Sequence, residues 1–309
     1  MNILLVAEEA AGIMALRALA RTEHRLVAAL TAEPTRGGGS TVAAAAAALG
    51  IPVLPSARVR EAETADWVRA QEIDLLLNVH SLYVVHPEVL HGPRIGSFNL
   101  HPGPLPEYAG LNAPSWAIYH GESEHAVTVH WMAPEIDAGP IAYATSFAIA
   151  AEDTGLTLSA RCAREGVPLL LRLVEQAAAN PAAIPRRPQD LTRRRYFGRE
   201  APNGGRLSWR WPAREVVNFV RASDYLPFPS PWGHPRARWR GQDLYILKAA
   251  LTGQPADRPA GTVGGLGGGA ATVAAGDEWL RIERVRLDDE PAAAAGELLV
   301  RGDVLEDGR

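Results

Sequence analysis

Short apolar runs that alternate with helical stretches constrain this chain more than any other feature. The runs contain almost no polar residues, as expected of strands that are covered on both faces of a sheet. They lie at residues 3–7, 26–31, 51–54 and 73–79. The helices predicted between them cover residues 11–21, 42–49 and 63–70. This order is typical of βαβ units, so we predict an α/β fold with a Rossmann-like, mostly parallel sheet.

The first turn of this sheet lacks the glycine pattern of nucleotide-binding proteins. Residues 8–12 are Glu-Glu-Ala-Ala-Gly, without the spacing G-x-G-x-x-G that lets a pyrophosphate approach the backbone. The phosphate-binding pattern G-x-x-x-x-G-K-[ST] does not occur in the sequence either. We therefore expect the sheet to serve a function other than nucleotide binding.

Residues 98–106, Phe-Asn-Leu-His-Pro-Gly-Pro-Leu-Pro, combine the end of a strand with a stiff loop. The prolines end the strand, because each one fixes φ and removes a hydrogen-bond donor. Asn99 and His101 are two residues apart, so on a strand they point to the same side. Open parallel sheets bind ligands at this carboxyl end. An amide donor beside a base that titrates near neutrality suits a carbonyl that becomes an oxyanion. Ordinary capping of the loop is the alternative interpretation.

Asp137 lies near the tip of a loop at residues 133–140, between two further predicted strands. This loop could bring a carboxylate next to Asn99 and His101. Neither the G-x-S-x-G pattern of a serine nucleophile nor the H-E-x-x-H pattern of a zinc protease occurs. The remaining chemistry is the attack of an amine on an activated carbonyl. In that reaction Asn99 would donate to the oxyanion, His101 would manage the proton, and Asp137 would orient the imidazole or a bridging water.

A metal site is a second way to use the polar residues of this region. The candidate ligands share no spacing that is typical of metal sites, and single histidines on apolar strands usually belong to the core. These candidates are His80, His101, His130 and Asp137. We therefore expect no metal.

The composition changes after a long predicted helix at residues 157–179. Residues 180–200 are rich in proline and arginine and indicate an exposed linker. We interpret its arginines as part of a solvent-exposed segment that is pinned to the first domain, rather than as nucleic-acid contacts. A short helix and several short strands with Gly-rich turns follow, which is typical of a small OB-like β-barrel. The strands are predicted at 244–249, 271–274, 279–287 and 297–301, and residues 261–270 are expected to have little structure.

The chain of 309 residues is long enough for two domains. We predict a catalytic domain at residues 1–180, a linker at 181–205 and the barrel domain at 206–309. The net charge is −4, and residues 207–309 carry thirteen basic against fourteen acidic side chains. This balance argues against a polyanionic partner such as tRNA.

Cysteine usage and the hydropathy pattern exclude further classes. Cys162 is the single cysteine, so neither an internal disulfide nor a cysteine metal cage can form. The N-terminus lacks the basic region and the cleavage site of a signal peptide. No apolar stretch is long enough to span a bilayer. We therefore expect a soluble, cytoplasmic protein without a membrane partner.

The motif at residues 98–110, followed by a strand and then by Asp137-Ala138-Gly139, resembles the folate-dependent formyltransferases. These enzymes include methionyl-tRNA formyltransferase, glycinamide ribonucleotide formyltransferase and the formyltransferases of UDP-amino sugars. Residues 207–304 resemble the C-terminal barrel of the family. The resemblance implies 10-formyltetrahydrofolate as the formyl donor, an amine as the acceptor, and Asn99, His101 and Asp137 as the catalytic set.

The resemblance also implies where the two substrates bind. A pterin pocket is expected beside two segments, since a flat pterin needs apolar walls with backbone donors and acceptors. These segments are Tyr83, Val84 and Val85, and Ala133, Pro134, Glu135, Ile136 and Asp137. The acceptor is expected beside Pro102, Tyr108, Asn112 and Trp116. Core packing is the alternative interpretation of Tyr83 to Val85.

The departures from the family pattern bear on the acceptor. Ala109 stands where many members carry Arg, and the loop at residues 33–40 is short, with Arg36 as its basic residue, where tRNA-formylating members have a longer basic insertion. We therefore favour a small-molecule amine or hydroxylamine over tRNA. Residues 224–233 resemble stand-alone members of bacterial secondary metabolism, whose acceptors are amino sugars, amino acids or hydroxyornithine. The alternative for this segment is that its aromatic residues attach the barrel to the first domain.

Other activities on the same residues stay open. Water in place of the amine would make the protein a formyltetrahydrofolate hydrolase. A protein that binds the folate without catalysing a reaction would be a folate-binding module. A homodimer that forms through the barrel or the linker is also compatible with the sequence.

Overall fold

The computed structural model describes residues 1–32 and 41–308. The loop at 33–40 lies outside the described residues, so the prediction made from it remains a prediction. The chain divides into two compact units. The first contains residues 1–113, 124–147 and 159–197, and the second contains residues 114–123, 148–158 and 198–309.

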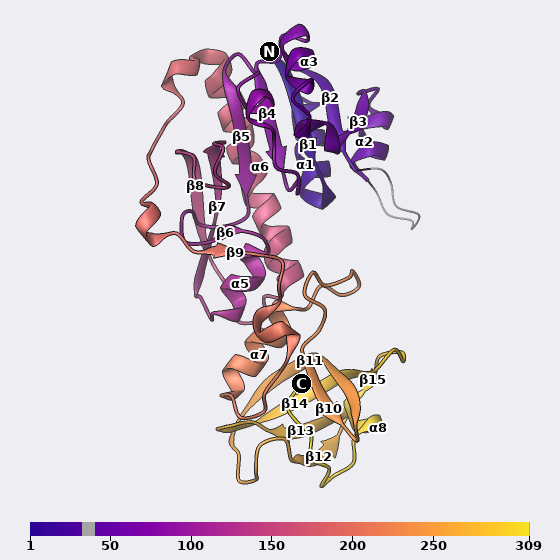
Figure 1. The fold of residues 1–309 in the computed structure, drawn as a ribbon. Coiled ribbons are helices and arrows are strands. Elements are labelled where there is room, and N and C mark those ends of the chain that lie inside the picture. The colour runs from indigo at the N-terminus through magenta and orange to yellow at the C-terminus, as the bar shows by residue number, and fades with distance from the viewer. Residues whose placement is uncertain (33–40, 309) are drawn as a thin grey trace. The chain divides into compact units, whose positions relative to one another are not determined.

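A seven-stranded sheet forms the centre of the first unit, in the order β3-β2-β1-β4-β5-β7-β8 (Figure 1). Strands β1 to β5 pair in parallel, and β7 pairs antiparallel with β5. This mostly parallel, Rossmann-like sheet confirms the predicted fold class. Its strands are β1 (Asn2–Ala7), β2 (Arg25–Thr31), β3 (Val53–Pro55), β4 (Leu75–Val79), β5 (Gly96–His101), β7 (Glu124–Trp131) and β8 (Ile141–Ala148).

Helices cover both faces of this sheet, which explains why its strands read as continuous apolar runs. Leu5 and Leu77 pack on one face with residues of α1, α2 and α6, whereas Leu4 and Leu76 pack on the other with residues of η1, α3 and α4. The helices are α1 (Glu9–Leu19), α2 (Val42–Ala48), η1 (Ser56–Arg60), α3 (Thr64–Ala70), α4 (Pro87–Leu90) and α6 (Gly155–Ala179).

The polypeptide between α6 and the second unit follows the first unit closely. It contains η2 (Pro181–Ala183), η3 (Leu191–Arg193) and β9 (Tyr196–Phe197), which pairs in parallel with β6 (Ala109–Gly110). We call residues 185–197 the strap. The prediction that the arginine-rich segment is pinned to the first domain is confirmed by this pairing. The domain limits at 180 and 205 remain predictions.

An antiparallel sheet forms the core of the second unit, in the order β10-β11-β14-β13-β12, with β15 beside β14. Residues 304 and 306 bridge to Thr262, next to β12, and to Arg238 on β10, so the C-terminal segment connects the two edges of the sheet. Trp209, Leu244 and Ile282 lie in its core. The strands are β10 (Arg236–Trp239), β11 (Gln242–Pro255), β12 (Val263–Gly267), β13 (Ala270–Ala274), β14 (Glu278–Leu287) and β15 (Ala293–Ala294).

The helices of this unit are α5 (Ala113–Tyr119), η4 (Pro202–Gly205), α7 (Ala213–Ala222) and α8 (Ala295–Leu298). The antiparallel sheet domain that the sequence predicts is therefore present. In the described part of the chain, no helix combines the length and the apolarity that crossing a bilayer requires.

Two local predictions in the second unit are wrong. Residues 261–270 contain strand β12 instead of an unstructured segment, because pairing with β13 outweighs the low strand propensity of glycine. The absence of a side chain at Gly264 also leaves room for the ring of Trp279, which a Cβ would meet at 2.7 Å. The predicted strand at 297–301 is replaced by α8 and an irregular end, since Ala295 packs into the core there.

The central strands predict a measurable cost of truncation. Leu77 is fully buried and Leu49 is 49% exposed. We expect Leu77→Ala to lower the free energy of unfolding by about 2–5 kcal/mol, because it leaves a cavity between strand and helices. Leu49→Ala, the matched control, should change it by less than about 0.5 kcal/mol. Urea denaturation followed by circular dichroism measures both; equal effects would contradict this description of the core.

Candidate functional site

Three polar side chains stand side by side across three neighbouring strands of the first unit. The strand register pairs Asn78 of β4 with Asn99 of β5, and Asn99 with His130 of β7. Asn78 Nδ2 donates to Asn99 Oδ1 at 3.0 Å, and Asn99 Nδ2 lies 3.1 Å from His130 Nε2. Residues in register on paired strands point to the same face, so the sheet itself gathers these groups.

The loop between β7 and β8 brings Asp137 to this row. Asp137 has φ +56°, a left-handed conformation that is uncommon for a non-glycine residue. Two positions later, a Cβ on Gly139 would collide with the carbonyl oxygen of Trp131, so the loop needs glycine there. The Asp-x-Gly pattern of the sequence therefore has a steric basis.

The carboxylate of Asp137 touches groups from three elements. Its Oδ1 lies 3.4 Å from both Asn99 Nδ2 and His130 Nε2. Its Oδ2 lies 3.5 Å from His101 Nδ1 and accepts a hydrogen bond from Gly110 N at 2.8 Å. The structure thus brings the three predicted residues Asn99, His101 and Asp137 together.

These contacts determine the charge of Asp137. Burial would raise its pKa, since the side chain is only 9% exposed. The imidazoles of His101 and His130 and the N–H of Gly110 outweigh burial and hold the pKa well below its ordinary value. The site therefore contains a carboxylate that stays ionised at neutral pH.

His101 is buried and oriented by a backbone carbonyl. Its Nε2 lies 2.6 Å from the oxygen of Tyr108, which can only accept, so Nε2 carries a proton. In the neutral ring Nδ1 is then unprotonated and faces Asp137. Burial lowers the pKa of His101, although the charge of Asp137 and the contact to Tyr108 act against it. A neutral imidazole whose basic nitrogen faces an ionised carboxylate can accept a proton.

His130 and Asn78 are functional candidates that sequence reasoning missed. His130 is 2% exposed, and its Nδ1 lies 2.8 Å from the oxygen of Trp131. The sequence offered it only as one of several scattered metal ligands. Asn78 Oδ1 is buried without a hydrogen-bond partner in the described structure. The signal for both was their register with Asn99, which a sequence does not display.

The segments predicted to bind the pterin differ in exposure. Val84 is 59% exposed, whereas Val85 is buried and Tyr83 packs partly buried against the same core cluster. Met132, which precedes the second segment, packs on that cluster too. In the second segment Ala133 is half-buried and Pro134, Glu135 and Ile136 are exposed.

The residues predicted to contact the acceptor are divided between the units. Pro102 lies in the first unit, where its oxygen is 2.9 Å from His125 Nε2. Tyr108 stacks on Phe197 with ring centroids 5.4 Å apart. Asn112 also lies in the first unit, with φ +56°. Trp116 belongs to the second unit and packs edge-on against Trp232.

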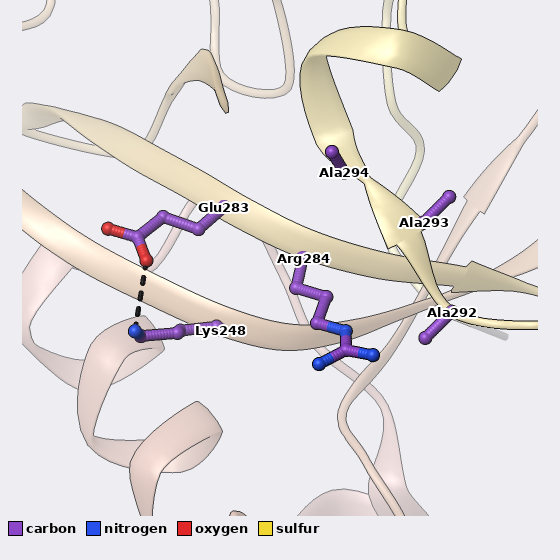
Figure 2. Close-up of a pocket in the computed structure, with 6 residues that line it drawn as sticks. All are labelled: Lys248, Glu283, Arg284, Ala292, Ala293 and Ala294. Carbon is purple, nitrogen blue, oxygen red and sulfur yellow. Dashed lines mark ion pairs between the residues drawn. The ribbon is translucent and has the colours of Figure 1, made fainter. Parts of the chain in front are cut away.

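The antiparallel sheet of the second unit carries a shallow pocket, shown in Figure 2. Lys248 on β11 and Glu283 on β14 form an ion pair of 3.1 Å at its edge, and the exposed Arg284 lies beside them. The other lining residues are Ala292, Ala293 and Ala294. Exposed ion pairs of this kind contribute little energy to stability.

Among the described residues, no set of three or more His, Cys, Asp or Glu side chains is arranged to hold a metal.

Solved structures share this fold. HypX from Aquifex aeolicus, in complex with tetrahydrofolic acid, matches with a TM-score of 0.66 and 19% identity over 94% of this chain. The chain spans only 45% of HypX. An N-formyltransferase from Helicobacter canadensis, in complex with folinic acid and dTDP-3-aminofucose, matches with a TM-score of 0.66 and 17% identity, over 91% of this chain and 98% of that one.

The sugar 3N-formyl transferase WlaRD, in the presence of dTDP and 5-N-formyl-THF, matches with a TM-score of 0.68 and 15% identity, over 94% of this chain and 99% of that one. At these identities the similarity establishes the fold alone.

Two family models match the sequence itself: "Formyl transferase" over residues 13–174 and "Formyl transferase, C-terminal domain" over residues 201–301. The matches confirm the resemblance read from the sequence, and the chain belongs to the formyl transferase family.

Proposed function

We propose that this chain is an N-formyltransferase that moves the formyl group of 10-formyltetrahydrofolate to the amine or hydroxylamine of a small molecule. The observation that carries the proposal is the convergence of Asn99, His101 and Asp137 within 3.5 Å contacts. Membership of the formyl transferase family supports the reaction type. The folates bound in the HypX and Helicobacter canadensis structures support a folate donor.

The three residues have distinct roles in the proposed reaction. The acceptor nitrogen attacks the formyl carbon, and the C=O becomes an oxyanion. Asn99 Nδ2 donates to that oxygen, since its 3.4 Å contact with Asp137 is weak enough to be exchanged. One such donor contributes about 10²–10³-fold in rate.

Proton transfer then completes the exchange. His101 Nδ1 accepts the proton that the attacking amine loses, and the nearby Asp137 carboxylate stabilises the resulting imidazolium. Collapse of the intermediate breaks the bond between the formyl carbon and N10 of the folate. The proton returns from His101 to N10, so tetrahydrofolate and the N-formyl product leave with all atoms balanced.

For the donor, we propose a pterin site beside Tyr83–Val85 and the loop 133–137. Burial of Val85 and part of Tyr83 supports apolar walls there. For the acceptor, we propose contacts to Pro102, Tyr108 and Asn112, all of the first unit; the contact assigned to Trp116 from the sequence remains a prediction. The dTDP-3-aminofucose in the Helicobacter canadensis structure supports an amino sugar as the first class to test.

Removal of the proposed base or carboxylate should strongly reduce turnover without unfolding the protein. We expect His101→Ala and Asp137→Asn to lower kcat by about 10²–10⁴-fold, the usual contribution of general acid–base catalysis. The measurement is tetrahydrofolate formation from 10-formyltetrahydrofolate with a panel of amino sugars, amino acids and hydroxylamines. The exposed His91 provides the matched control, His91→Ala, which should keep the wild-type rate.

Two outcomes would count against this assignment. Near-normal rates in both variants would remove these residues from the mechanism. Release of tetrahydrofolate at the same rate with and without an amine would identify water as the acceptor, and the protein would be a hydrolase.

The pH profile should report the environment of His101. Because burial lowers the pKa of His101 below the ordinary histidine value of 6.5, kcat/KM should fall only when the pH drops below 6.5. His130 and His80 lower the same pKa, whereas the Asp137 charge raises it. The residual activity of Asp137→Asn should therefore decline at a lower pH than that of the wild type. An acid limb that moves to higher pH would contradict the assignment of His101 as the base.

A further inference from the structure

The strap, residues 185–197, is anchored to the sheet before it reaches the candidate site. Its Pro185 oxygen accepts from Trp131 Nε1 at 2.8 Å, and Arg186 stacks over the Trp131 ring at 3.9 Å. Arg187 and Ile141 exchange two backbone hydrogen bonds of 2.8 and 3.0 Å. These contacts fix the strap next to the two ends of the loop that carries Asp137.

The strap then holds the backbone of that loop. Gln189 Nε2 donates to the carbonyl oxygens of Asp137, at 2.8 Å, and Gly139, at 2.6 Å. Arg194 donates to the oxygen of Ile136 at 2.8 Å. A left-handed residue such as Asp137 persists only when its surroundings compensate for the conformational strain. Gln189 bridges the residues on either side of the bend and supplies part of that compensation.

The far end of the strap holds the other partner of the carboxylate. Ala109 N donates to the oxygen of Arg195 at 3.0 Å, and Leu111 N donates to the oxygen of Phe197 at 2.9 Å. Between them lies Gly110, where a Cβ would collide with the carbonyl of Phe197. The N–H of Gly110 in turn donates to Asp137 Oδ2. The strap therefore fixes both the donor and the acceptor of this hydrogen bond.

We propose that the strap positions the Asp137 carboxylate against His101, and that Gln189 is the positioning residue through which it acts. This inference rests on the proposed function, since it assigns Gln189 to the same reaction without contact to either substrate. Both hydrogen-bond partners of Gln189 are carbonyl oxygens, so only a side chain with a hydrogen-bond donor can hold them. Its Oε1 is buried without a hydrogen-bond partner in the described structure. The hydrogen bonds of this side chain therefore come from Nε2 alone.

The chemistry of the contact dictates the variants. Gln189→Ala removes both donors, and Gln189→Glu keeps the shape but places a carboxylate against two carbonyl oxygens. Gln189→Lys has donors and no acceptor, so it should restore the contact. Gln176→Ala is the matched control, because Gln176 Nε2 also donates to one backbone carbonyl of this unit, that of Asn180, at 3.2 Å.

We expect Gln189→Ala and Gln189→Glu to lower kcat by about 10- to 100-fold, the effect of a misplaced catalytic group, with KM for 10-formyltetrahydrofolate within about threefold of the wild type. Gln189→Lys and Gln176→Ala should keep kcat within about threefold of the wild type. Thermal unfolding, measured for all four variants, checks that each is folded. Should the alanine variant not fold, the isosteric glutamate variant provides the comparison.

A readout that needs no activity separates this inference from the proposed function. The pKa of His101, followed by NMR and assigned with a His101→Gln variant, should fall in Gln189→Ala, which adds no charge, because a displaced Asp137 raises it less. If the wild type transfers no formyl group but this shift occurs, the proposed function fails and the positioning role of Gln189 stands. Wild-type kcat and an unchanged His101 pKa in Gln189→Ala would overturn the inference, and so would a loss that Gln189→Lys does not restore.

Discussion

The site depends on one buried, ionised carboxylate. A carboxylate without partners in a protein interior is unstable and takes up a proton. Asp137 avoids this because amide, imidazole and backbone N–H groups surround it. Those groups come from three separate elements of the sequence, β5, β6 and β7. The requirement to satisfy Asp137 therefore ties β5, β6, β7 and the strap into one arrangement. Burial, acting against the charge of Asp137, favours the neutral form of His101 that can accept a proton.

The antiparallel strand β7 makes this arrangement possible. In a purely parallel sheet the groups at the carboxyl ends come from consecutive βα turns. Here β7 runs back along β5, places His130 opposite Asn99, and leaves the sheet beside Phe98. The loop that follows must then turn back toward Asn99 and His101. The left-handed Asp137 and the close approach of Gly139 to Trp131 achieve this turn.

Membership of the formyl transferase family explains the chemistry better than it explains the substrate. Sheets of this type serve many reactions, and function is decided by the site that a fold carries. The polar row on β4, β5 and β7 is the arrangement to which we assign the proposed acyl transfer. In the proposed reaction, the choice of acceptor would depend on residues near this row, such as Asn112 and Ala109.

The sequence by itself determined the sheet, most of its strands and the motif that carries the proposed catalytic residues, because these depend on local signals: apolar runs, proline loops and the Asn-x-His and Asp-x-Gly spacings. It failed where long-range contacts outweigh local propensity, as in the glycine-rich β12 and in α8. Only the tertiary structure decided that His130 and Asn78 stand beside Asn99, and that Gln189 holds Asp137 from 52 residues away. Strand register and the path of the strap depend on which segments meet in space. Composition and periodicity are local properties and do not specify these long-range contacts.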